Sequence, residues 1–183
     1  MKKVLWVFFL MLCAGTLKAQ FGIRTGFSSA NFSDTNFSAR SGFHAGVYYA
    51  TGSDFIKVEP GLQFAQKGYT GNDDMGVAID EQLNYLDIPV LVRLNLLPIV
   101  NVFAGPQASF LLSRNYQLGA ISSNSLEVLT GYDLAGVVGA QVNLPLGINL
   151  QASYDIGLKS LNYFNTDVKN RVFKISLGYS FTN

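Results

Sequence analysis

The feature that most constrains this chain is a period-two alternation of apolar and polar residues in its last strand-like segment, Arg171 to Phe181. Successive side chains of a β-strand point to opposite faces, so one face of this segment is wholly apolar and the other is polar with a lysine. The apolar face comprises Phe173, Ile175, Leu177, Tyr179 and Phe181, and the polar face Lys174, Ser176, Gly178 and Ser180. A soluble sandwich strand would alternate similarly, so the rest of the chain must decide the fold class.

The alternation recurs along the chain and predicts eight strands. The expected strands are about Gln20–Ser33, His44–Tyr49, Phe55–Tyr69, Tyr85–Leu94, Val100–Arg114, Tyr132–Leu144, Ile148–Lys159 and Arg171–Phe181. Short turns follow the second, fourth and sixth strands, and longer polar loops follow the first, third, fifth and seventh. The long loops are Asp34–Ser41, Thr70–Gln82, Asn115–Leu129 and Asn162–Asn170. Pro60 lacks an amide proton, and we expect a β-bulge there.

An even strand number, short turns at one end and long loops at the other are typical of bacterial outer-membrane barrels. We therefore predict an all-β fold, an eight-stranded antiparallel up-and-down transmembrane β-barrel, with both termini on the periplasmic side of the cell outer membrane. A two-sheet sandwich is the alternative fold. A soluble, secreted ligand-binding barrel is a further alternative, in which the apolar faces would point inward; membrane fractionation separates it from an inserted barrel.

The N-terminal segment is typical of a secretory signal peptide spanning residues 1–19. Lys2 and Lys3 form its positive region, Val4–Leu12 its apolar core, and Ala19 precedes the expected cleavage site. The apolar run is shorter than the ~20 residues that a membrane-spanning helix needs, which disfavours an anchor. A lipoprotein cut at Cys13 is disfavoured because a leucine precedes this cysteine where such sites carry a small residue.

Length and composition agree with one barrel domain over residues 20–183. The chain has 183 residues and a net charge of +1, so it has no basic excess with which to bind nucleic acid. Charged residues make up 14%, below the roughly 25% of soluble domains. The single cysteine lies in the segment expected to be removed, so no disulfide is predicted.

A family resemblance is carried by the segments Ser41–Gly46, Val58–Leu62 with Gln66–Tyr69, Leu83–Val90, Phe103–Gln107 and Tyr154–Leu158. These segments resemble the PorT-like outer-membrane β-barrel family of Gram-negative bacteria. The resemblance covers nearly all of the chain after residue 19 and implies an eight-stranded barrel, in a family mostly without an assigned activity. Its namesake takes part in secretion and surface maturation, a role that fold alone does not transfer. The chain departs from the usual aromatic C-terminus of such barrels, because Thr182 and Asn183 follow Phe181.

The inward faces of the predicted strands carry many charged residues. The predicted lumen charge network consists of Arg24, His44, Lys57, Glu59, Lys67, Asp87, Arg93, Asp133, Asp155, Lys159 and Lys174. An eight-stranded barrel is just wide enough for side chains to fill its interior, and buried charges must be paired. A lumen plugged by ion pairs is therefore favoured over a narrow channel or a barrel that binds a small anion.

His44, the only histidine, invites comparison with outer-membrane enzymes that modify lipids with a histidine and a serine. Ser38 and Ser41 lie near it in sequence, and Glu59 is expected to face the same lumen. The alternation points His44 inward, whereas a lipid-modifying site must open to the bilayer. A hydrogen-bonded structural histidine is therefore favoured, and we predict no enzymatic activity.

No cofactor or metal is predicted. The acidic residues Asp73, Asp74, Asp80 and Glu81 match no calcium-loop spacing and are assigned to a solvated external loop. The expected partners are outer-membrane lipid and a protein bound through the extracellular loops. The predicted function is a structural or interaction role that assists secretion or surface assembly.

Overall fold

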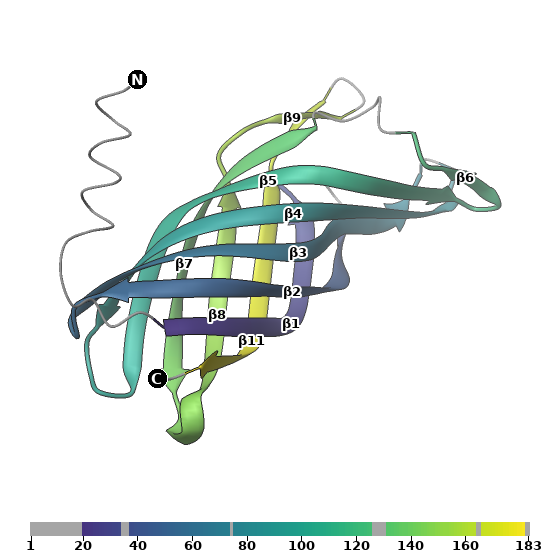
Figure 1. Ribbon diagram of the computed structural model, residues 1–183. Coiled ribbons are helices and arrows are strands. Elements are labelled where there is room, and N and C mark those ends of the chain that lie inside the picture. The colour runs from purple at the N-terminus through teal and green to yellow at the C-terminus, as the bar shows by residue number, and fades with distance from the viewer. Residues whose placement is uncertain (1–19, 34–36, 74, 126–130, 164–165, 182–183) are drawn as a thin grey trace.

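The computed structural model describes residues 20–33, 37–73, 75–125, 131–163 and 166–181 (Figure 1). The predicted signal peptide, residues 1–19, lies outside the described residues. The strands are β1 (Gln20–Phe32), β2 (Ser38–Gly52), β3 (Ile56–Asn72), β4 (Ala78–Asn95), β5 (Val100–Leu118), β6 (Ile121–Ser123), β7 (Tyr132–Asn143), β8 (Ile148–Gly157), β9 (Leu161–Tyr163), β10 (Thr166–Val168) and β11 (Asn170–Phe181). A single short 3₁₀ turn, η1 (Pro145–Gly147), is the one helical element of the described chain.

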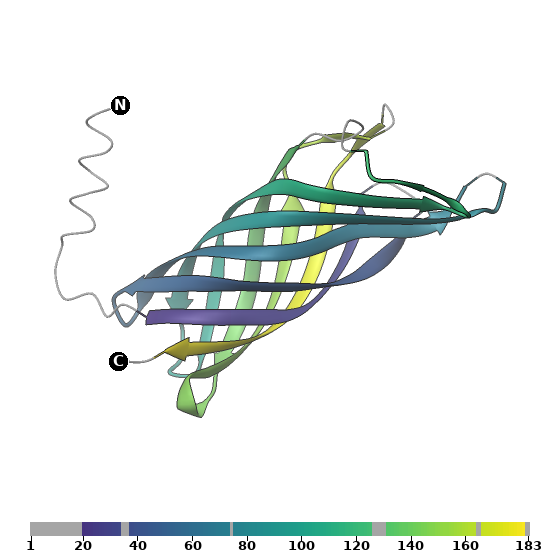
Figure 2. The same ribbon diagram turned by 45° about the vertical axis from the view of Figure 1, so that its right-hand side comes forward.

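Eight of these strands form a closed antiparallel ring. Hydrogen bonds join them in the order β4, β3, β2, β1, β11, β8, β7 and β5, and pairing of β4 with β5 closes the ring. The first and last strands are neighbours: Phe21 pairs with Phe181, and the register continues to Phe32 and Asn170. Figure 2 shows the tilted strands enclosing a barrel. The predicted up-and-down barrel is confirmed.

The two ends of the barrel differ. At one, here called the terminal end, β1 begins, β11 ends and the strands are joined by short turns (Figure 1). At the other, here called the loop end, β3, β4 and β5 run on as strands of 17, 18 and 19 residues and form an extension. Strand β6 pairs with the tip of β5, and β9 and β10 form a separate hairpin between β8 and β11.

Two expectations from the sequence are wrong at the level of single strands. The loop expected over 70–82 is mostly strand, because β3 continues to Asn72 and β4 begins at Ala78. The bulge expected at Pro60 is absent: Pro60 pairs with Val90 of β4 in an unbroken register. The missing amide proton interrupts pairing with β2 without adding a residue to β3. Register shifts occur instead in β2 before His44 and in β5 at Leu112, where Asn84 pairs with Ser113 and Tyr85 with Leu111.

The outer surface is apolar over the middle of the barrel. Exposed aliphatic side chains include Val47, Val58, Leu62, Val90, Leu150 and Leu177. Aromatic residues border this zone at both ends: Phe21, Tyr49, Tyr179 and Phe181 at the terminal end, and Phe27, Phe43, Phe64, Phe110 and Tyr132 toward the loop end. An apolar band between two aromatic girdles is the outer surface of a membrane barrel.

Within the described ranges, the structure contains no helix long and apolar enough to cross a membrane.

Candidate functional site

The candidate site is the lumen, which the inward face of each strand lines with polar and charged side chains. Strand β8 shows this arrangement most simply, because exposed and buried residues alternate along its whole length. The buried polar residues of this strand are Asn149, Gln151, Ser153 and Asp155, while Leu150 and Tyr154 face outward. The same alternation on the other strands brings charges from distant parts of the sequence together in layers.

The layer nearest the terminal end, here called the arginine layer, consists of Arg24, Glu59 and Arg93. Arg93 donates two hydrogen bonds to Glu59, from Nε to Oε2 and from Nη2 to Oε1, the latter at 2.8 Å. Arg24 donates from Nη1 to Glu59 Oε1 at 3.1 Å. Two guanidinium groups therefore share one carboxylate, in a layer where each side chain is at most 9% exposed. Charge-assisted hydrogen bonds of this kind hold side chains in a fixed geometry.

Neutral amides and rings complete the arginine layer. Arg93 donates to Asn101 Oδ1 at 2.8 Å and to Gln151 Oε1 at 2.7 Å, and Arg24 donates to Gln141 Oε1 at 3.3 Å. The guanidinium of Arg24 lies 4.3 Å from the ring centroid of Tyr48, and that of Arg93 lies 4.4 Å from the centroid of Phe103. These cation–π contacts cover the flat faces of the guanidinium groups.

The next layer, here called the lysine–aspartate cluster, lies at the centre of the lumen. Asp87 accepts hydrogen bonds from Lys67 at 2.9 Å and from Lys174 at 3.2 Å. Lys174 also contacts Asp155 at 2.7 Å, and Lys67 donates to Ser109 at 3.0 Å. Each charged member is at most 3% exposed, so the cluster fills the lumen with ion pairs that exclude solvent.

Two further predicted residues lie beside this cluster. His44 is 1% exposed and its Nε2 lies 2.8 Å from Ser176 Oγ. Its partner is therefore a serine of β11 and not Ser41, which lies on the outward face of β2. His44 Nδ1 has no hydrogen-bond partner among the described residues, so no carboxylate orients the ring. Asp133 accepts a hydrogen bond from Asn170 Nδ2 at 2.8 Å.

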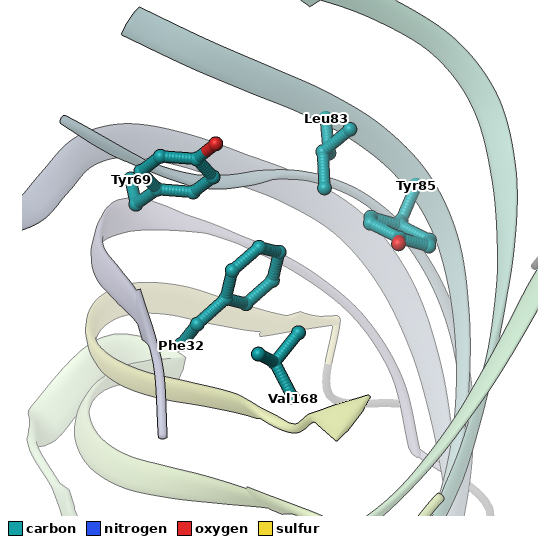
Figure 3. Packing of buried hydrophobic residues seen from close by; sticks show 5 residues of the cluster. All are labelled: Phe32, Tyr69, Leu83, Tyr85 and Val168. Carbon is teal, nitrogen blue, oxygen red and sulfur yellow. The ribbon is translucent and has the colours of Figure 1, made fainter. Parts of the chain in front are cut away.

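The loop end of the lumen is closed by apolar side chains (Figure 3). This apolar plug consists of Phe32, Tyr69, Leu83, Tyr85 and Val168, each at most 3% exposed. The rings of Phe32 and Tyr69 have centroids 5.1 Å apart. The Lys67 ammonium lies 4.6 Å from the centroid of Tyr85, so the plug rests directly on the lysine–aspartate cluster.

Sequence reasoning missed an ion pair beside the plug. Arg114 donates from Nε and Nη2 to the two carboxylate oxygens of Glu81, both at 2.8 Å, and both residues are buried. Glu81 was expected in a solvated loop. The burial of Glu81 could have been predicted, because Glu81, Leu83 and Tyr85 share the alternation that points Asp87 inward. The burial of Arg114 could not, because it depends on the extra residue of β5 at Leu112, which reverses the alternation there.

Two predicted members lie outside the buried network. Lys57 is half-buried near the terminal end, where its Nζ donates to Gln20 Oε1 at 3.0 Å. Lys159 follows the end of β8 and lies over the outward-facing ring of Tyr132, 3.1 Å from its centroid. The expected inward position of Lys159 is wrong because the strand alternation ends with β8 at Gly157.

The acidic residues considered for calcium do not converge. Asp73 Oδ1 accepts the backbone N–H groups of Met75 and Val77 and so shapes a turn, whereas Asp80 pairs with Arg40. Asp74 lies outside the described residues. No group of three or more metal-ligating side chains is present in the part of the chain that the structure describes.

Two cavities flank the arginine layer. The larger, about 220 Å³, opens at the terminal end and has Arg93, Glu59 and several amide side chains in its wall. The smaller, about 20 Å³, lies between the arginine layer and the lysine–aspartate cluster and is lined by Arg24, His44 and Asp155 among others. Its volume suits one water molecule. The arginine layer therefore separates an open vestibule from the filled centre of the lumen.

Comparison with known proteins gives one consistent picture. Residues 14–163 match the family model described as outer membrane protein beta-barrel domain. No curated protein sequence matches the chain. The structure is similar to Ail, the attachment invasion locus protein of Yersinia pestis, with a TM-score of 0.60 and 17% identity over 90% of this chain and 99% of Ail. It is also similar to Neisserial surface protein A, with a TM-score of 0.57 and 14% identity over 91% of this chain and 97% of the other. A major outer membrane protein of Thermus thermophilus gives a TM-score of 0.55 and 15% identity, over 89% and 99% of the two chains.

Proposed function

The chain belongs to the outer membrane protein beta-barrel domain family, and we propose that it is a non-conducting, non-enzymatic barrel that acts at the cell surface by binding a protein partner through its extracellular extension. As a member of this family it is a small barrel of the cell outer membrane. Barrels of this kind place their short turns in the periplasm and their long loops outside the cell. The terminal end accordingly faces the periplasm, and the loop end is extracellular.

The observation that carries this proposal is the closure of the lumen. A solute entering from the periplasm meets the arginine layer, then the lysine–aspartate cluster, then the apolar plug. Opening a path would require separating buried ion pairs, and leaving one buried charge without its partner costs roughly 3–5 kcal/mol. Transport through the lumen is therefore disfavoured, and the function is assigned to the surface that reaches beyond the membrane.

The outer face of the extension is polar and held by its own hydrogen bonds. Arg40 donates to Asp80 and, at 2.8 Å, to Gln82 Oε1. Gln82 Nε2 donates to Asn84 Oδ1 at 3.1 Å, and Asn84 Nδ2 donates to Ser113 Oγ at 2.8 Å. This row crosses β2, β4 and β5, so the extension presents an ordered polar surface supported from behind by the apolar plug. Such a surface suits a specific protein contact.

The finer part of the proposal rests on the resemblance to the PorT-like family, whose namesake serves secretion and surface maturation. We propose an accessory role of that kind for this chain, with residues 1–19 removed on export. The neighbours Ail and Neisserial surface protein A are named for attachment and invasion and for the cell surface. Their identities of 17% and 14% support the shared fold and leave the partner of this chain to experiment.

Site-specific photo-crosslinking in intact cells tests the proposal. A photoreactive amino acid at Gln82, on the extension, is compared with one at Leu150, on the lipid-facing surface. We expect a discrete protein adduct from position 82 only. Absence of an adduct at position 82, or the same adducts at both positions, would contradict binding through the extension.

Conductance and hydrolysis measurements test the other two parts of the proposal. The purified protein is expected to give no stable channels in planar bilayers, where a general porin serves as the positive control. Ion-selective channels of porin size would show that the lumen opens. An esterase or deacylase assay is expected to show no activity above that of a His44→Ala variant, and an activity lost in this variant would identify an enzyme.

A further inference from the structure

We propose that the vestibule at the periplasmic end is a binding site for a small oxyanion that carries a carboxylate or phosphate group. This site is separate from the extracellular surface assigned above. The vestibule has a volume of about 220 Å³, and its wall includes Gln20, Asn101, Gln141, Asn143, Glu59 and Arg93. This volume has room for several waters or one small organic acid.

The first argument is the charge of the arginine layer. Arg93 and Arg24 share the single carboxylate of Glu59, which leaves one positive charge in excess beside the vestibule. Both oxygens of Glu59 already accept hydrogen bonds from arginine, so its negative charge is engaged within the layer. An anion in the vestibule would lie next to this layer and be attracted by its excess positive charge.

The second argument is the direction of the hydrogen bonds in the vestibule wall. A guanidinium or ammonium group can only donate, so a side-chain amide bonded to one must present its oxygen to it. Asn101 presents its oxygen to Arg93, and Gln20 presents its oxygen to Lys57. The NH₂ group of each amide is then left to donate elsewhere, and both residues line the vestibule.

A relay extends the same rule to a third amide. Arg24 donates to Gln141 Oε1 at 3.3 Å, which fixes the orientation of that amide. Gln141 Nε2 then donates to Asn143 Oδ1 at 2.7 Å, so Asn143 is left with its NH₂ group. Three amides of the wall are thus oriented by buried or half-buried cations to offer donors. A wall rich in hydrogen-bond donors, next to the positively charged arginine layer, favours the binding of oxyanions over cations.

The test is calorimetric titration of the full-length mature protein in a neutral detergent, with inorganic phosphate in one arm and succinate in the other, at constant ionic strength. Saturable binding of either anion at one site is expected, and calcium chloride is expected to give none. Saturation by phosphate alone assigns a phosphate site, and saturation by succinate alone assigns a carboxylate site. Repeating the titration in phospholipid nanodiscs separates a headgroup from a free anion, because a headgroup already in the site would weaken binding of added phosphate.

Isosteric substitutions provide the control. Asn101→Asp keeps the acceptor for Arg93 but replaces the free NH₂ donor with a carboxylate, so anion affinity should fall by about tenfold or more. Asn84→Asp is the same change on the extracellular extension and should leave affinity unchanged. Glu59→Gln removes the negative charge of the layer and should strengthen binding. The proposal is overturned if neither anion binds saturably, if Asn101→Asp and Asn84→Asp behave alike, or if Glu59→Gln weakens binding.

Discussion

The two halves of β4 place their polar and apolar residues on opposite faces, although they belong to one uninterrupted strand. In the membrane half, Ile88, Val90 and Val92 face outward while Asp87 and Arg93 are buried inside. In the extracellular half, the outward residues are polar and the buried ones are largely apolar. Asp80, Gln82 and Asn84 face outward there, and Leu83 and Tyr85 lie in the apolar plug.

The difference follows from what surrounds each half. Apolar side chains are stable in contact with lipid chains on the outer face of the membrane half. Polar groups therefore lie inside the lumen, where they must form hydrogen bonds and ion pairs with one another. Beyond the membrane the outer face meets water, and the extension needs an ordinary apolar core on its inner face. The barrel is therefore held together by ion pairs at its centre and by apolar packing at its loop end, and each kind of support can be tested separately.

The largest effect is expected in the lysine–aspartate cluster. Asp87→Ala leaves the ammonium groups of Lys67 and Lys174 without the carboxylate they share, and should destabilise the folded barrel by about 3–5 kcal/mol. Urea titration in lipid vesicles, followed by circular dichroism, measures the change. Asp73→Ala, in an exposed turn, is the control and should cost far less. Equal losses in both variants would show that the centre does not depend on paired charges.

The apolar plug should give the next largest effect. Leu83→Ala opens a cavity among fixed side chains and should cost about 2–5 kcal/mol. Leu150→Ala removes the same atoms from a lipid-facing position, where lipid chains refill the space and only the transfer part remains. Leu83→Ala should therefore be the more damaging by at least about 1 kcal/mol in the same unfolding assay. A larger loss from Leu150→Ala would contradict a packed extracellular core.

A smaller change is expected when the buried pair at the plug is replaced as a unit. Glu81→Leu alone leaves the Arg114 guanidinium buried without its carboxylate, at a cost of about 3 kcal/mol or more. Glu81→Leu combined with Arg114→Met removes both buried charges, together with the hydrogen bond from Arg114 to the Ser125 carbonyl, and should return stability to within about 2 kcal/mol of the wild type. If the double variant is as unstable as the single one, the loop end depends on its ion pair and resembles the centre.

The smallest effect should come from the outer face of the extension. Asp80 is 45% exposed where it pairs with Arg40. Water screens such a pair, so Asp80→Ala should change the free energy of unfolding by less than about 1 kcal/mol. The same variant is expected to weaken partner crosslinking from position 82. A stability loss comparable to that of Asp87→Ala would place Asp80 in the structural core.

The membrane half could be predicted from the sequence because lipid imposes a strict alternation. Arg24, Glu59, Lys67, Asp87, Arg93 and Lys174 all lie in the lumen where the period-two pattern placed them. The pairing of these charges could not be predicted, because it depends on how far each strand is shifted along its neighbour.

The extracellular half was missed because its pattern is inverted. A stretch with Asp80 and Glu81 looks like a solvated loop when polar residues are expected only outside the strands, yet Glu81 is fully buried. Lys159 was misplaced for a related reason, since alternation was extended past the end of β8. Both errors arise where the surroundings of a strand change and its chemical pattern changes with them.

The most direct test of this account is a spin-label series along the outward face of β4 in lipid bilayers. Labels at Val92, Val90 and Ile88 should be accessible to oxygen and protected from a water-soluble nickel reagent. Labels at Gln82 and Asp80 should show the reverse, with the crossover near Asn84. Oxygen accessibility that continues unchanged to position 80, or nickel accessibility at Val90, would contradict the change of surroundings on which the two halves depend.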